Sequence, residues 1–164
     1  MAEPHEQRVE AVKTDPEALE ALPDGRQLRE RLGLIAEGRV RMETPIPETI
    51  SFHDPCYLGR YNGVYDAPRH ILESIPGLKL QELPRSRERG LCCGAGGGRM
   101  WMEEKLGTRI NQERMKEISA AGTDAVGVSC PFCMIMLGNA KDELATTTAP
   151  FDVLELARRS MTLD

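Results

Sequence analysis

The feature that most constrains the fold of this chain is the spacing of its five cysteines. Cys56 stands alone, 35 residues separate it from the adjacent pair Cys92–Cys93, and another 36 residues precede Cys130-x-x-Cys133. These positions fall in three loops, with none in the interior of a predicted helix or strand. Buried hydrophobic thiols would explain one or two of them but not the whole set. A fold that uses all five must bring three distant segments together.

Composition narrows the class of protein. The chain has 164 residues, 40% of them hydrophobic, and a net charge of −5 without a long basic block, so we expect one globular domain that does not bind nucleic acid. The stretch GAGGGR lacks the Lys-Ser/Thr of a phosphate-binding loop and the spacing of a dinucleotide-binding loop. Nothing in the sequence resembles a nucleophile–base pair for hydrolysis.

The compartment in which the chain is expected to lie indicates the oxidation state of its cysteines. The N-terminus is polar and acidic, with no apolar segment like that of a signal peptide, and no apolar run approaches the roughly 20 residues that span a bilayer. We therefore expect a cytoplasmic chain, peripheral to the membrane at most, with no direct insertion. Its cysteines should be reduced thiols, and an odd count also fits poorly with a closed set of disulfides.

Residues 48–164 alternate between short apolar runs and segments with helical spacing. The predicted strands are Glu48–His53, Leu78–Glu82 and Ala125–Ser129. The predicted helices are Ala67–Ser74, Trp101–Ala121 with an interruption near Gly107, Pro131–Leu144 and Phe151–Ser160. This order predicts an α/β fold, with a small parallel, Rossmann-like sheet between two layers of helices and right-handed crossovers.

Residues 1–47 are expected to form an N-terminal arm that is partly flexible. Short helices are predicted at Pro16–Leu22 and Arg26–Glu37, and Thr44–Glu48 should be an extended connector because it contains two prolines. The folded domain is expected to cover residues 48–164.

The predicted topology places the cysteines at one edge of the sheet. Cys56 follows the first strand, Cys92–Cys93 follow the second at some distance, and Cys130 follows the third. The carboxyl ends of parallel strands share one edge, where ligand sites of such sheets gather. The sequence therefore predicts that the cysteines share one site.

The local motifs suit a metal centre. Cys130 and Cys133 can lie on one turn at the start of a helix, whose positive end favours thiolates. Adjacent side chains such as Cys92 and Cys93 normally diverge, so both reach one centre only from an irregular backbone. Gly94 and the glycines after it supply that irregularity.

Three kinds of sulfur site compete for this pattern. A structural zinc ion needs four ligands and would leave one cysteine over. A redox-active dithiol at Cys130-x-x-Cys133 would leave the other three unexplained. An iron–sulfur cluster fits best, because such clusters are held by thiolates from distant loops.

The motif Cys56…Cys92-Cys93-Gly94…Cys130-x-x-Cys133 resembles the CCG, or cysteine-rich, domain of heterodisulfide reductases and their relatives. The segments HDPCYLGRYNGVYDAPR and ERGLCCGAGGGRMWMEE are similar to the last domain of large, membrane-associated oxidoreductases related to those reductases. The similarity covers about residues 32–157. The resemblance implies a [4Fe–4S] cluster of an unusual non-cubane form, with ligands Cys56, Cys92, Cys93, Cys130 and Cys133.

The resemblance also implies a role and partners. Such proteins pass electrons from electron-transfer flavoprotein or acyl-CoA dehydrogenases toward quinones, or act on a disulfide. The large relatives also carry membrane helices and a ferredoxin-like module, which this sequence lacks. We therefore expect an electron-relay module that depends on a flavoprotein or other redox subunits, with association to the membrane only through a membrane subunit. The alternative is a structural zinc-binding or interaction module in a larger complex.

Four residues beside the cysteines are expected to support the cluster. His53 could donate a hydrogen bond to a cluster sulfur, although a residue there more often caps a loop. Arg60 and Arg99 flank the cysteine loops and would offset the negative charge of the cluster. Gly94 would provide the backbone freedom that the cysteine pair needs.

Overall fold

The computed structural model describes residues 40–103 and 106–162 of the chain. The helices predicted at Pro16–Leu22 and Arg26–Glu37, and most of the proposed arm, lie outside the described residues. No helix in the described part is long and apolar enough to cross a membrane.

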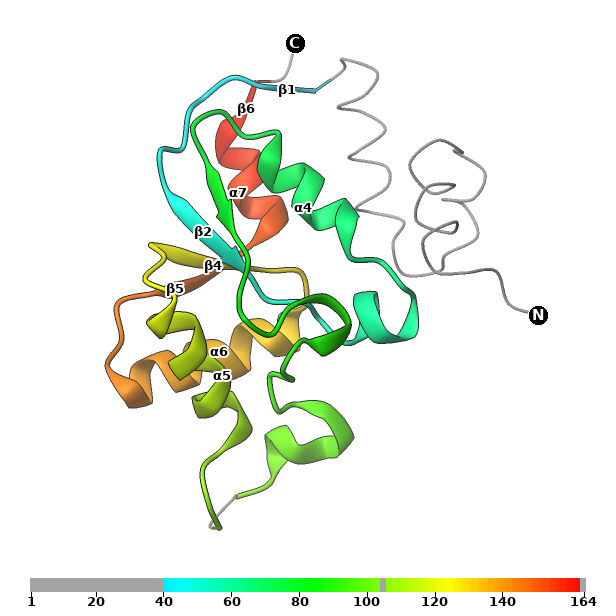
Figure 1. Ribbon diagram of the computed structural model, residues 1–164, viewed down its shortest axis with the longest axis vertical. Coiled ribbons are helices and arrows are strands. Elements are labelled where there is room, and N and C mark those ends of the chain that lie inside the picture. Colours follow the sequence, from blue (N-terminus) through cyan, green and yellow to red (C-terminus); the bar gives the residue numbers. More distant parts are fainter. Residues whose placement is uncertain (1–39, 104–105, 163–164) are drawn as a thin grey trace, which may run out of the picture.

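A parallel sheet of four strands forms the centre of the domain (Figure 1). The strands are β2 (Thr49–Phe52), β3 (Lys79–Gln81), β4 (Ala125–Val128) and β5 (Ala149–Asp152), in the spatial order β3-β2-β4-β5. All three neighbouring pairs are parallel. The predicted parallel α/β fold is therefore confirmed.

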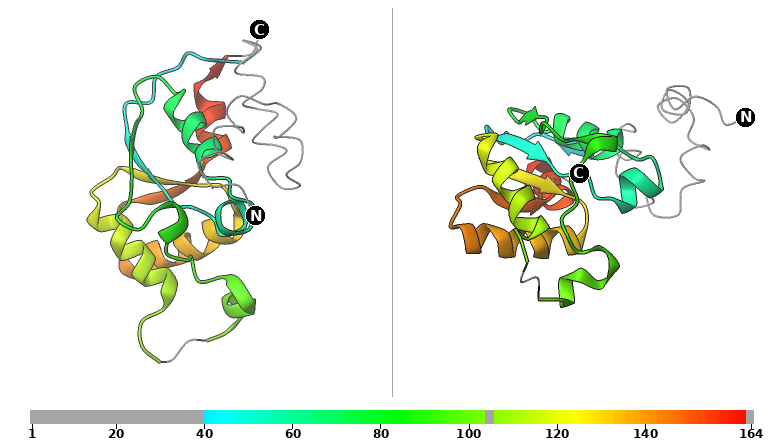
Figure 2. Two further views of the ribbon diagram at one scale, coloured as in Figure 1. Left: turned by 45° about the vertical axis from the view of Figure 1, so that its right-hand side comes forward. Right: turned by 60° about the horizontal axis from the view of Figure 1, so that its bottom comes forward.

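Helices cover both faces of this sheet, which gives the predicted three layers (Figure 1). Helices α4 (Asp66–Glu73) and α7 (Val153–Ser160) contact each other on one face, and α5 (Ile110–Ala120) and α6 (Pro131–Leu144) contact each other on the opposite face. Three shorter helical turns lie in the loops: the π-helix η1 (Tyr57–Tyr61) and the 3-10 turns η2 (Arg87–Arg89) and η3 (Gly96–Trp101). The segment around η3 projects away from the sheet in both views of Figure 2.

Alternation along the central strands decides which side chains reach which layer. Ile50 and Phe52 of β2 belong to the core under α4 and α7, whereas Val126 and Val128 of β4 belong to the core under α5 and α6. Because successive side chains of a strand point to opposite faces, His53 continues from β2 toward the α5–α6 face. The strand pattern thus delivers a polar residue to the layer that also contains cysteines.

Each layer has its own hydrophobic core. The α4–α7 core consists of Ile46, Ile50, Phe52, Leu58, Ile71, Leu72, Ile75, Ala125, Val153, Leu156 and Ala157. The α5–α6 core consists of Leu83, Cys93, Met115, Ile118, Val126, Val128, Cys133, Met136, Leu137 and Ala140.

Two predicted elements differ from the structure. The helix predicted over Trp101–Ala121 begins only at Ile110, because η3 and the turn at Gly107, with φ of +70°, come before it. The helix predicted over Phe151–Ser160 begins at Val153, since Ala149–Asp152 form the strand β5. Pro150 concealed this strand, but a proline is tolerated here because β5 is an edge strand with a single neighbour.

A second, smaller sheet was also not predicted. The strand β1 (Arg41–Met42) pairs antiparallel with β6 (Met161–Thr162). Two residues are too short for a recognisable alternation, so no local pattern indicated either strand.

Candidate metal centre

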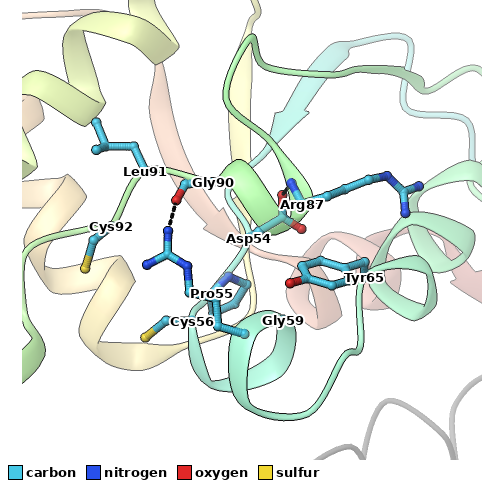
Figure 3. Close-up of a pocket in the computed structure, with 10 residues that line it drawn as sticks. Asp54, Pro55, Cys56, Gly59, Tyr65, Arg87, Gly90, Leu91 and Cys92 are labelled. Atoms are coloured by element: carbon cyan, nitrogen blue, oxygen red, sulfur yellow. Dashed lines mark hydrogen bonds between the residues drawn. The ribbon is translucent and has the colours of Figure 1, made fainter. Parts of the chain in front are cut away.

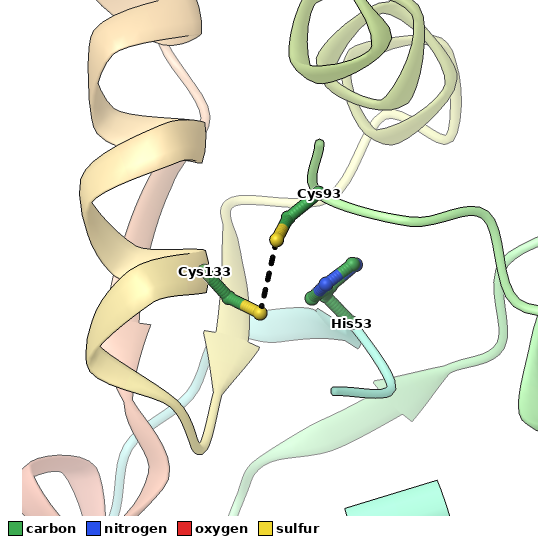
Figure 4. Close-up of side chains that lie close together, drawn as sticks. All are labelled: His53, Cys93 and Cys133. Carbon is green, nitrogen blue, oxygen red and sulfur yellow. Dashed lines mark hydrogen bonds between the residues drawn. The ribbon is translucent and has the colours of Figure 1, made fainter. Parts of the chain in front are cut away.

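The deepest part of the cysteine site contains Cys93, Cys133 and His53 (Figure 4). All three side chains are buried, and their ligand atoms lie within 4.8 Å of one another. The sulfur atoms of Cys93 and Cys133 are 3.4 Å apart. The residues come from three different elements: the end of β2, the loop before η3 and the first turn of α6. The parallel topology therefore joins segments that are far apart in the sequence.

Cys92 and Cys130 extend this group toward the surface, and each is partly exposed. Cys92 hydrogen-bonds to Cys93, and its sulfur also accepts a hydrogen bond of 3.3 Å from the backbone N–H of Gly94. Cys130 precedes α6 as its N-cap residue, and Pro131 takes the first helical position, where no N–H is needed. Cys130 hydrogen-bonds to Cys133.

Cys56 completes the group at the mouth of a small pocket (Figure 3). The pocket is lined by Cys56 and Cys92 together with residues of η1 and of the loop that contains Gly90. The sulfur atoms of Cys56 and Cys92 lie on the same side of this pocket (Figure 3). All five cysteines are therefore gathered at the carboxyl edge of the sheet, while their role as metal ligands stays a prediction.

Hydrogen bonds among the cysteines shift their pKa values in alternating directions. Hydrogen bonds with Cys133 and Cys92 lower the pKa of Cys93 well below its usual range, and the contact with Cys133 lowers the pKa of Cys130 to about 6. The pKa values of the other two cysteines shift upward. Hydrogen bonds with Cys130 and Cys93, together with burial, raise the pKa of Cys133. The hydrogen bond with Cys93, together with burial, raises the pKa of Cys92. The hydrogen bonds thus link the cysteines in the order Cys92, Cys93, Cys133 and Cys130.

His53 is held between a cysteine and an arginine. Its Nδ1 accepts a hydrogen bond of 3.1 Å from Nε of the buried Arg114, and its side chain also hydrogen-bonds to Cys93. Burial lowers the pKa of His53 despite the bond to Cys93, so the imidazole is neutral at neutral pH. His53 therefore lies beside the Cys93 sulfur, and its predicted hydrogen bond to a cluster sulfur stays a prediction.

Gly94 takes the irregular backbone that the cysteine pair requires. Its φ is +90°, and an added Cβ would lie 3.3 Å from the backbone nitrogen of Asn111 and from Cβ of Ile110. A side chain at this position would therefore be strained and would press the cysteine loop away from α5.

The two predicted arginines differ in position. Arg60 of η1 donates from Nη2 to the backbone oxygen of Gly90, which ties the Cys56 segment to the loop before Cys92. Arg60 also lines the pocket that contains Cys56 and Cys92. Arg99 is exposed on η3, outside that pocket, so its place beside the cluster stays a prediction.

A buried ion pair anchors the segment that leads into Cys56. Arg69 of α4 donates to both carboxylate oxygens of Asp54, at 2.7 and 3.0 Å, and Asp54 also accepts a bond of 2.7 Å from the backbone N–H of Arg87. Arg69 forms a further ion pair with Glu82. Burial opposes the charge of Arg69, but these carboxylates outweigh it and raise its pKa. The chain on either side of the pocket is therefore fixed to α4.

The sequence interpretation missed Arg69 and Arg114, because charged residues in helices are usually solvated. A signal for Arg114 was nevertheless present in the sequence. Asn111, Met115 and Ile118 recur at helical spacing, and Arg114 falls on the same stripe, which is buried. A charge on an apolar helix stripe indicates a buried partner.

Curated relatives of this chain are redox proteins. It is 49% identical over 134 residues to the probable iron-sulfur-binding oxidoreductase FadF of Bacillus subtilis, covering 78% of this chain and 18% of FadF. It is 38% identical over 130 residues to a subunit of the dihydromethanophenazine:CoB–CoM heterodisulfide reductase of Methanosarcina barkeri, covering 79% and 32%. It is also 38% identical over 137 residues to EtfAB:quinone oxidoreductase of Syntrophomonas wolfei, covering 78% and 19%.

This chain therefore spans between 18% and 32% of the length of these three relatives. No solved structure matches it. The family model of the cysteine-rich domain, CCG, matches residues 50–138, a range that includes all five cysteines. The resemblance seen in the sequence is thus confirmed, and the chain belongs to the CCG family of cysteine-rich domains.

Proposed function

We propose that this chain is an iron–sulfur electron-transfer module of a heterodisulfide-reductase-like oxidoreductase. The observation that carries the proposal is the continuous group of five thiols at one edge of the parallel sheet, with the Cys93 and Cys133 sulfurs 3.4 Å apart. Residues 48–164 would form the module, and residues 1–47 the arm. The names of the relatives support a redox role for this chain. Most of the length of each relative lies outside the match, so their full activities are only proposed for this chain.

The chemistry of the donor set suits an iron–sulfur cluster. Such clusters are held by thiolates, and two of the five thiols, Cys93 and Cys130, already have lowered pKa values. Five cysteines exceed the four that hold a cubane cluster, so either one of them is not a ligand or the cluster has the non-cubane [4Fe–4S] form that the family resemblance implies, and we propose the latter. The ligands would be Cys56, Cys92, Cys93, Cys130 and Cys133.

Zinc is the second candidate, on a specific observation. His53, Cys93 and Cys133 lie within 4.8 Å of one another, and mixed histidine–cysteine sets are typical of structural zinc sites. In that case the chain would be a structural or interaction module in a larger complex. The two further cysteines beyond a four-ligand site make zinc the less favoured interpretation.

When bound, the cluster would supply one-electron oxidation and reduction. The residues of this chain would hold and shield it: the burial of Cys93 and Cys133 excludes water from the inner side, and His53 hydrogen-bonds to the Cys93 sulfur. Because no group among the described residues around the cysteines identifies a particular thiol substrate, we favour electron relay over direct action on a disulfide.

An apolar rim marks the side on which a redox partner would bind. All large hydrophobic side chains that are exposed in the described residues belong to the three segments that carry the cysteines: Tyr57, Tyr61, Trp101, Met102, Leu106, Phe132 and Ile135. Exposed apolar side chains on the loops that surround a site are typical of interaction surfaces. The partners would be a flavoprotein, either electron-transfer flavoprotein or a dehydrogenase, as donor and a quinone- or disulfide-reducing subunit as acceptor.

We also propose a cytoplasmic location at the inner face of the membrane. Attachment there would come from a membrane subunit rather than from insertion of this chain. Co-fractionation with membranes that is lost when the partner subunit is deleted would support this placement, and retention on partner-free lipid vesicles would contradict it.

Metal analysis tests the proposed function directly. Iron, zinc and acid-labile sulfide are measured on the full chain purified without oxygen, with about four irons and matching sulfide expected per chain. Single Cys→Ser changes at the five positions should each lower the iron content. Met115→Leu is the matched control, since it removes a buried sulfur of the same core that is not a predicted ligand. About one zinc without sulfide would overturn the electron-transfer proposal.

A further inference from the structure

Arg114 is an unusual core residue. Its side chain on α5 is fully buried, so a permanent positive charge lies within the layer that contains the cysteines. Two bonds hold the outer side of the guanidinium: Nη1 donates to Glu117 at 2.8 Å and to the backbone oxygen of Arg85 at 2.9 Å. Glu117 is fixed in turn by Arg85, through its backbone N–H and its Nε. The orientation of Arg114 is therefore determined from the surface side.

The inner side of Arg114 points at His53. Nε of Arg114 donates to Nδ1 of His53 at 3.1 Å. An arginine in a protein stays protonated and has no acceptor, so Nδ1 must be the unprotonated nitrogen of the imidazole. A neutral imidazole then carries its proton on Nε2, which is left to make the hydrogen bond to Cys93. Hydrogen bonds thus connect Glu117, Arg114, His53 and Cys93 in series, with Arg114 donating to both Glu117 and His53.

We propose that Arg114 is a positioning residue that fixes His53 as the Nε2–H tautomer, so that His53 donates a hydrogen bond to the Cys93 sulfur at all times. The inference rests on the proposed function, because the bond gains its importance when Cys93 binds a cluster. Without Arg114, the proton of His53 is free to move to Nδ1, and a lone pair then faces the sulfur. A donor to a ligating thiolate stabilises the more negative, reduced cluster and raises its potential.

The proposed role of Arg114 can be distinguished from an effect of its charge and from an effect of its packing. A charge effect depends only on the positive group, which lysine retains. A packing effect is independent of His53. Fixing the tautomer requires an N–H at the Nε position of Arg114 and an imidazole to accept its hydrogen bond. Lysine has a methylene group at that position, so the effect fails with lysine, and it has no meaning once His53 is absent.

The test compares midpoint potentials of the full chain with its cluster. Arg114→Lys and Arg114→Met should both lower the potential, by about 59 mV for a tenfold change in a one-electron equilibrium. In a His53→Leu background Arg114→Lys should produce no further shift, because lysine keeps the positive charge and no imidazole remains to be fixed. Arg109→Met is the matched control, since Arg109 immediately precedes α5 and pairs with Glu143 on α6 at 2.7 Å, and it should leave the potential unchanged.

Two results would overturn the proposal: a wild-type potential in Arg114→Lys, or a shift of Arg114→Lys that persists in the His53→Leu background. If metal analysis finds no cluster, the proposed function fails but the positioning role is still decided by the ¹⁵N NMR spectrum of the histidines in that cluster-free chain. The Nε2–H tautomer of His53 supports it, and the Nδ1–H tautomer overturns it. Exposed His70 serves as internal reference, and Arg114→Lys should give a mixture of tautomers at His53 only.

Discussion

The two faces of the sheet are each covered by a pair of helices, but the two cores differ in chemical composition. The core under α4 and α7 is aliphatic apart from Phe52, and its described buried members include no sulfur. The core under α5 and α6 contains Cys93, Cys133 and two buried methionines, and His53 and Arg114 lie beside it. One layer closes the fold by packing, while the other accepts polar and reactive groups that packing alone would not favour.

This difference indicates how the domain accommodates charged and reactive groups in its interior. A buried charge or thiolate is costly unless it is paired, and in the α5–α6 layer each has a partner: Glu117 for Arg114, and Cys133 for Cys93. The α4–α7 layer supplies stability without involving these groups. Arg69 of α4 is buried, and its guanidinium reaches out of the layer to hold Asp54 in the segment before Cys56.

The largest effect on stability is expected at this connection. Arg69→Met leaves Asp54 buried without its partner, which should lower the free energy of unfolding by about 3–5 kcal/mol. Urea unfolding followed by circular dichroism measures the loss. Arg109→Met, which removes a partly exposed ion pair, should cost less than about 1 kcal/mol. Equal costs for the two variants would show that the α4–α7 layer does not anchor the Cys56 segment.

A matched pair of leucines compares the layers directly. Leu156→Ala in the α4–α7 core and Leu137→Ala in the α5–α6 core remove equal, fully buried side chains, so each should cost about 2–5 kcal/mol. Only Leu137→Ala should also lower the metal bound per folded chain, because α6 carries Cys133. Metal analysis of the folded fraction separates the two, and similar metal content in both variants would remove the distinction between the layers.

A smaller effect is expected where η1 packs on the segment that leads into α4. An added Cβ on Gly59 would lie 2.4 Å from Cε1 of the buried Tyr65, so Gly59→Ala should destabilise the domain by about 1–3 kcal/mol. The reactivity of Cys56 toward a thiol reagent should rise as the η1 segment is displaced. Unchanged stability would mean that the Tyr65 ring moves aside and that this contact does not fix Cys56.

The smallest effect should be a gain. Gly138 lies in the interior of α6, and an added Cβ would meet nothing within 4 Å. Gly138→Ala should therefore stabilise the chain by about 0.5–1 kcal/mol through helix propensity, with unchanged metal content. Thermal unfolding in parallel with the wild type measures the gain, and a loss of stability would show that α6 needs flexibility at this point.

The sequence predicted the parts of the fold that follow from periodicity. β2, β3, β4, α4 and α6 were identified, and with them the edge at which the cysteines meet, because parallel strands with helical crossovers leave few alternatives. The edge strand β5 was missed because Pro150 interrupts its pattern. The helix α5 was predicted to begin too early, because Met102 and Leu106 continue its helical spacing on the N-terminal side of Gly107.

The supporting side chains of the site were harder to predict than the cysteines. Cysteine spacing is visible in the sequence, whereas the role of Arg114 depends on a contact with His53, 61 residues away. Arg69 and Asp54 are only 15 residues apart, but a helix and a loop must first be oriented before they meet. Such pairs are properties of the assembled layers, not of any local pattern.

The late position of β5 and α7 in the chain has a consequence for the order of synthesis. All five cysteines precede Val153, Leu156 and Ala157, which complete the α4–α7 core. During translation there is an interval in which every thiol has been made but the last strand and its helix have not. Parallel pairing across long crossovers is slow, so a metal ion captured in that interval would link loops of an unfinished sheet. If the chain binds the proposed cluster, we expect its insertion to follow the synthesis and pairing of β5.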